Sequence, residues 1–65
     1  MTVYVEVYQD KDPLGSQQWY ASTFAVYPDR AVWFEGRLKP QPTERMAVEA
    51  ARFGYSEAEV VVVQE

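Results

Sequence analysis

The chain lacks two residue types on which many small proteins depend. Its 65 residues include no cysteine and no histidine. Disulfide bonds and a histidine-based catalytic triad are therefore excluded, and zinc lacks its usual ligands. No stretch approaches the roughly 20 apolar residues that cross a bilayer, and the first residues lack the basic and apolar segments of a secretory signal. We expect a cytoplasmic protein that holds no cofactor or metal and is stabilised by its hydrophobic core alone.

Glycine and basic residues are also scarce. The glycines Gly15, Gly36 and Gly54 are isolated, which excludes a phosphate-binding loop and a dinucleotide-binding fingerprint. Ten acidic against six basic residues give a net charge of −4, so the overall field repels phosphate and favours a basic partner. Glu6 and Glu35 can share one side of a sheet, but no pocket is evident that would suit them to acid–base catalysis. We therefore expect a protein that is not an enzyme.

Three segments in the first half of the chain show the two-residue period of β-strands. Alternating side chains, rich in valine and aromatic residues, predict strands over residues 2–9, 19–27 and 31–38. Charged residues, a proline and a glycine predict a hairpin loop over residues 10–16. A second turn is predicted over residues 28–30, so the three strands form a meander.

The second half predicts a helix and a final strand. Pro40 and Pro42 cannot extend the third strand, and Thr43 can cap a helix that runs to about Gly54. The continuous apolar run Val60–Val63 is typical of a strand that is covered on both faces. The side of the helix predicted to face the sheet carries Met46, Ala47, Ala50, Ala51 and Phe53.

This order of elements predicts a single α+β domain over residues 1–65. We expect a two-layer β-β-β-α-β fold whose four-stranded, mostly antiparallel sheet has the strand order 3-2-1-4, with the helix packed on one face. The order resembles that of the small domains of bacterial antitoxins of the HicB type, and the helix of residues 47–52 followed by a valine strand is similar in style. The resemblance lies in the layout alone, which many small bacterial and phage proteins share. It carries no functional residue over to this chain.

A single helix can cover only one face of such a sheet. Its short side chains suit a core built from the first strand, half of the second and third strands, and part of the valine run. The residues predicted for the covered face are Val3, Val5, Val7, Phe24, Val26, Val32 and Phe34.

The opposite face is then left with aromatic side chains among charged ones. Tyrosine and tryptophan bring a large contact area with a polar tip and recur as binding hot spots, so this face is predicted to bind a partner. An ordinary solvated sheet face is the alternative interpretation. The predicted partner-binding residues are Tyr4, Glu6, Tyr8, Trp19, Tyr27, Trp33, Glu35 and Arg37.

The final strand suggests what that partner is. If Val60–Val63 lies at a sheet edge, the chain needs cover there, and we expect a homodimer formed through this edge or by stacking of the aromatic faces. If the run is central in the sheet, only the aromatic face argues for an interface. One specific version is a phage-type or antitoxin-type inhibitor that occludes a basic nucleic-acid-binding surface of another protein. The alternative function is single-stranded nucleic-acid binding by aromatic stacking, against which the acidic charge argues.

Overall fold

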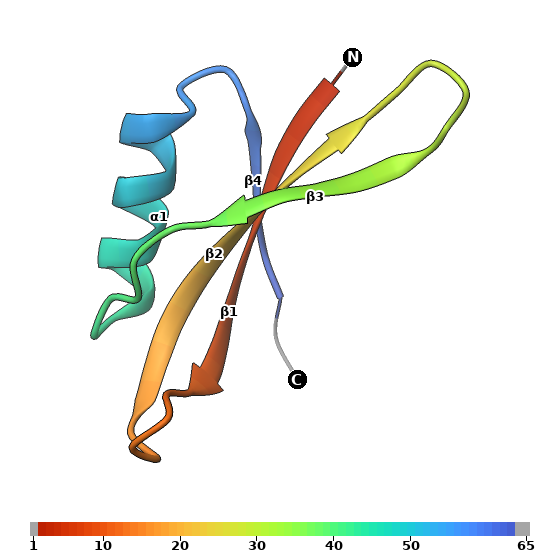
Figure 1. Ribbon diagram of the computed structural model, residues 1–65. Helices are drawn as coiled ribbons and strands as arrows, with labels where there is room; N and C mark the ends of the chain where they lie inside the picture. The colour runs from red at the N-terminus through yellow and green to blue at the C-terminus, as the bar shows by residue number, and fades with distance from the viewer. Residues whose placement is uncertain (1, 64–65) are drawn as a thin grey trace.

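Four strands and one helix make up the computed structural model, which describes residues 2–63 (Figure 1). The strands form one sheet in the order β3-β2-β1-β4. Strand β1 is antiparallel to β2 and parallel to β4, and α1 crosses one face between β3 and β4. The predicted α+β fold and its strand order are confirmed. The elements are β1 Thr2–Lys11, β2 Gln17–Val26, β3 Val32–Arg37, α1 Glu44–Gly54 and β4 Glu59–Val62.

The first hairpin closes through a three-residue loop that its residue types favour. The amide of Asp12 donates a hydrogen bond to the carbonyl of Ser16 at 2.9 Å, so these two residues close the loop just beyond the last ladder pair, Lys11 and Gln17. Pro13 takes the first loop position, where its fixed φ suits a type I turn. Gly15 takes the third position with φ +86°, a left-handed conformation that costs glycine little. This loop fixes the register of β1 against β2.

The second hairpin repeats the same design. The amide of Tyr27 donates to the carbonyl of Ala31 at 3.0 Å, and Pro28 again starts the loop. Arg30 occupies the left-handed third position with φ 70°, which is a strained backbone for a residue with a side chain. Further along β3 the register shifts between Gly36 and Phe34, which makes a β-bulge there.

The register decides which side chains share a face. Val5 pairs with Thr23 and Val7 pairs with Ala21, so odd-numbered residues of β1 and β2 face the helix together. Alanines on both layers let α1 lie close to the sheet. The buried core consists of Val5, Val7, Ala21, Ala47 and Ala51, with partly buried side chains packed around it.

The face predicted for β2 and β3 was therefore wrong. Phe24 pairs with Tyr4 and with Phe34, and Val26 pairs with Val32, so these residues lie on the side turned away from α1. The prediction grouped the bulkiest apolar residues of each strand into one core. The two loops set the pairing instead, and a shift by one residue moves a whole strand pattern to the other face.

The side of the helix that faces the sheet was predicted only in part, since Ala47 and Ala51 are buried as expected. The Oγ1 of Thr43 accepts a hydrogen bond from the amide of Met46 at 3.2 Å, so the predicted cap is confirmed. Val48, which was not among the residues predicted to face the sheet, packs against the core beside the two buried alanines. Met46 and Phe53 were wrongly placed toward the sheet, since they are 44% and 94% exposed.

Strand β4 is an edge strand with one covered face. Val60 and Val62 pack partly against the core, while Val61 and Val63 are 41% and 42% exposed on the other side of the sheet. The predicted cover on both faces is therefore wrong in the described chain. Across residues 2–63, the structure contains no helix long and apolar enough to cross a membrane.

Candidate functional site

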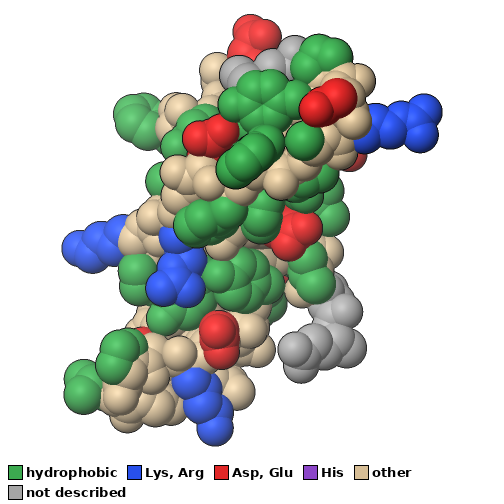
Figure 2. Space-filling view, turned by 45° about the vertical axis from the view of Figure 1, so that its right-hand side comes forward, with side chains coloured by type: hydrophobic (Ala, Val, Ile, Leu, Met, Phe, Trp, Pro, Cys, Tyr) green, Lys and Arg blue, Asp and Glu red, His purple; other side chains and the backbone are tan. Residues whose placement is uncertain are grey.

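The open face of the sheet, meaning the side turned away from α1, carries a row of stacked aromatic rings. The ring of Tyr4 lies 5.2 Å from that of Phe24 between centroids, and Phe24 lies 5.7 Å from Phe34 in an edge arrangement. Such pairs are favourable ring geometries. Phe34 is nevertheless 61% exposed, because β3 is the last strand on its side of the sheet. Figure 2 shows hydrophobic side chains gathered along this face, with acidic and basic ones among them.

A second row on the open face holds a positive charge in a fixed place. The rings of Tyr8 and Tyr20 lie 5.8 Å apart, and the guanidinium of Arg37 lies 4.5 Å from the centroid of Tyr20. The hydroxyls of Tyr8 and Ser22 are 3.0 Å apart, and a guanidinium nitrogen of Arg37 donates to the Tyr8 hydroxyl at 3.5 Å. The hydrogen bond to Tyr8 is the main reason why the pKa of Arg37 is raised. The cation is thus held over a tyrosine ring in a preferred cation–π position.

A carboxylate lies between the two rows. Glu6 pairs across the ladder with Ser22 on one side and with Val61 on the other. Glu6 is only partly exposed and forms no ion pair with any residue in the described part of the chain. Besides Asp10 near the end of β1, the open face therefore presents one fixed cation and one half-buried anion within a mainly apolar surface.

The predicted partner-binding residues divide between the two faces. Tyr4, Glu6, Tyr8 and Arg37 lie together on the open face, as predicted. Glu35 is the extra residue of the bulge, next to Phe34 on the exposed outer strand.

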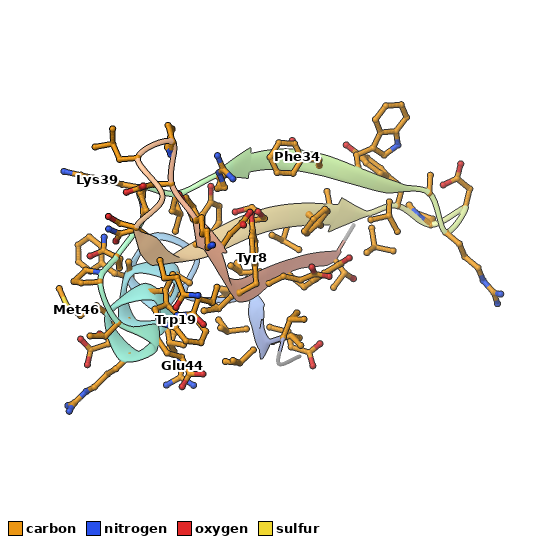
Figure 3. All side chains as sticks on the ribbon, turned by 90° about the horizontal axis from the view of Figure 1, so that it is seen from below. Tyr8, Trp19, Phe34, Lys39, Glu44 and Met46 are labelled. Atoms are coloured by element: carbon orange, nitrogen blue, oxygen red, sulfur yellow. The ribbon has the colours of Figure 1, made fainter. Side chains whose placement is uncertain are left out.

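Trp19 does not belong to the open face, where it was predicted. Its ring is half-buried against the core, and Figure 3 shows it beside α1, whereas Phe34 lies on the far side of the sheet. The amide and carbonyl of Trp19 exchange hydrogen bonds with Gln41, both at 2.8 Å. The segment that follows β3 is thereby tied to the edge of β2, and Trp19 acts as a structural residue.

Tyr27 and Trp33 were also predicted on the open face and lie on the opposite one. Trp33 pairs with Ala25, which faces the helix side. Helix α1 contacts β1, β2 and β4 but does not reach β3, so Trp33 stays 62% exposed. A shallow hollow of about 640 Å³ at this end of the hairpin is lined by Tyr27, Pro28, Asp29 and Trp33.

Sequence reasoning missed the aromatic centre of the open face. Phe24 and Phe34 were assigned to the core, and Tyr20 and Ser22, which share their side of the sheet, were not among the predicted partner-binding residues. The signal that would have found them lies in the loops. In the first hairpin, Pro13 followed two residues later by Gly15 indicates a three-residue loop, and this length fixes which faces of β1 and β2 coincide.

The structure offers no enclosed site for chemistry in the residues it describes. A hollow of about 960 Å³ borders the end of β1, but its lining includes Tyr8 and Phe24 from the open face and Trp19 from the helix face, so it wraps around a sheet edge. Among residues 2–63, no three histidine, cysteine, aspartate or glutamate side chains converge as metal ligands. No protein-family model, curated protein or solved structure matches the chain.

Proposed function

We propose that this chain is a non-catalytic protein that binds a protein partner, either another protein or a second copy of itself, through the open face of its sheet. The observation that carries this proposal is the sheet face that no helix covers. The single helix covers one face, while the other presents Phe34 at 61% exposure, Val32 at 54% and Val61 at 41% around stacked rings. Exposed apolar surface of this continuity is typical of an interaction site.

The thin core of the isolated chain supports the same proposal. The fully buried side chains are no larger than valine and threonine, and most others in the core are alanines. Strand β3 touches no helix, and all but one of its residues are exposed. Burial at about 25 cal/mol per Å² is the main stabilising term in small domains, so a partner that covers β3 would add substantially to stability.

The polar residues of the face are suited to setting the orientation of a partner. Arg37 is held in one position by two tyrosines, so little side-chain freedom is lost when it meets an opposite charge. If the partner is a different protein, the net charge of −4 favours a basic surface, such as the nucleic-acid-binding surface that an inhibitor would occlude.

Site-specific photo-crosslinking in the native cells tests this proposal. A photoreactive phenylalanine analogue replaces Phe34 in one sample and Phe53 in the control. Phe53 is the same residue type and is 94% exposed, but it lies at the far end of α1. We expect protein adducts, of any identity, at position 34 and not at position 53.

Two results would contradict the proposed protein interface. Equal adducts at both positions would mean that exposure alone determines capture. Adducts to nucleic acid at position 34 would favour the stacking function instead, and that complex would weaken steeply as salt is raised.

A further inference from the structure

The open face has an internal symmetry that identifies its partner. Strand β2 carries Phe24 and Ser22 on this face, and each has one neighbour on β1 and one on β3. The row through Phe24 is aromatic on both sides. The row through Ser22 has a carboxylate, Glu6, on the β1 side and a guanidinium, Arg37, on the β3 side. The charges are therefore arranged as mirror opposites about β2.

We propose that the open face binds a second copy of this chain, with a two-fold axis that runs along β2. Rotation about that axis places β1 of one copy over β3 of the other. Arg37 then meets Glu6 of the second copy, Phe34 meets Tyr4, and Phe24 meets its own equivalent. This inference rests on the proposed protein-binding role of the face and names its partner.

Glu6 and Arg37 form no ion pair with each other within one chain. The Arg37 guanidinium reaches across β2 to Tyr8, and Asp10 is the carboxylate whose charge acts on it. Glu6 has no ion-pair partner among the described residues, and Arg37 turns to Tyr8 and Tyr20 instead. A two-fold contact supplies both missing partners at once, because an isologous interface uses every contact twice.

The dimensions of the chain are consistent with this geometry. The Cα extents are 38 × 21 × 20 Å, so one side of the molecule has a projected area of roughly 800 Å². A stable interface buries about 800 Å² per partner, so nearly the whole face must take part. An axis through the aromatic centre on β2 meets that need better than pairing of the β4 edges, which involves a strand of four residues. Stacked sheets pack about 10 Å apart, which leaves room for the rings between them.

Charge exchange tests this arrangement by sedimentation equilibrium. The apparent mass of the unmodified chain is expected to rise from 7.5 kDa toward twice that value as the protein concentration increases. Arg37→Glu places glutamate against Glu6, and Glu6→Arg places arginine against Arg37, so each variant alone is expected to dimerise roughly tenfold or more weakly. An equimolar mixture of the two restores both opposite-charge pairs and is expected to form the mixed dimer. The double variant Glu6→Arg/Arg37→Glu is expected to dimerise like the unmodified chain.

The control separates local pairing from net charge. Arg52→Glu on α1 changes the net charge as Arg37→Glu does, but at an exposed position outside the open face. It is expected to retain most of the dimer. Circular dichroism of each variant verifies that the fold is intact before association is compared.

The outcomes distinguish this inference from the proposed function. A monomer at all concentrations overturns the dimer, while adducts to a different protein at position 34 would leave the proposed function standing. A dimer whose affinity is the same in Arg37→Glu, in Glu6→Arg and in the unmodified chain overturns the axis along β2. Failure of the mixture to restore association, with both variants folded, also overturns it.

Discussion

Thr23 provides a direct test of the register that places the open face. Its side chain is 2% exposed beneath α1, and its Oγ1 is buried with no hydrogen-bond partner in the described chain. A buried hydroxyl that lacks a partner costs about 1–3 kcal/mol. Valine has nearly the same shape and an equally good strand propensity, so Thr23→Val removes this cost without creating a cavity.

We expect Thr23→Val to raise the free energy of unfolding by about 1 kcal/mol, at the lower end of that range because the surrounding side chains relax. In a domain of this size, 1 kcal/mol corresponds to a rise in Tm of roughly 4–8 °C. Differential scanning calorimetry at one fixed protein concentration measures it, because association also shifts Tm. If the sequence-based face assignment were right, Thr23 would lie on the exposed face and the change would stay within about 0.5 kcal/mol.

The neighbouring residue on β2 supplies a matched contrast. Ser22 points to the open face, and its hydroxyl lies 3.0 Å from that of Tyr8. Ser22→Ala is expected to lower the free energy of unfolding by about 1 kcal/mol, because the part-buried Tyr8 hydroxyl loses this hydrogen bond. A stabilising Ser22→Ala together with a destabilising Thr23→Val would refute the register.

Two further substitutions test the helix layer by calorimetry and circular dichroism. Thr43→Ala removes the side-chain oxygen that accepts from the Met46 amide and is expected to cost about 1 kcal/mol, whereas Thr43→Ser should retain most of the stability. Ala51→Leu places a large side chain where the alanine is fully buried against the sheet. It is expected to lower the free energy of unfolding by about 1–3 kcal/mol. An unchanged free energy of unfolding would show that α1 does not lie close to β1 and β2.

Local signals in the sequence were sufficient to predict the elements of the fold. The two-residue period marked the first three strands, the run of valines marked the fourth, and Thr43 and Gly54 marked the ends of the helix. The parallel pairing of β4 with β1 followed from the right-handed crossover rule, because a helix lay between two strands. These features depend on the nearest residues in the chain or on general topology.

The composition of the candidate site was harder to predict because it depends on the register between strands. Tyr4 and Tyr8 were placed correctly relative to the core, since β1 alternates clearly between valine and polar or aromatic residues. The side chains on either side of β2 are compatible with burial. The prediction chose the side with the larger apolar side chains, which was the wrong one. Small residues facing the helix, such as Ala21, were the better guide because α1 is itself rich in alanine.

Trp33 shows a second limit of pattern reasoning. Its side of β3 is the helix side, but the helix ends its coverage at β2, so the ring is exposed on the covered face. How far a helix reaches across a sheet depends on the crossing geometry and on the connection that follows β3. Hydrophobic periodicity contains neither quantity.

The most direct test of the central claim compares the mass of the unmodified chain with that of Phe34→Ala by sedimentation equilibrium over the same dilution series. We predict a dimer of twice 7.5 kDa for the unmodified chain. Phe34→Ala should dissociate at roughly thirtyfold higher concentration, as expected for loss of a central hot-spot side chain. A mass of 7.5 kDa throughout, or a dimer equally tight in both proteins, would contradict the claim that a second copy covers the open face.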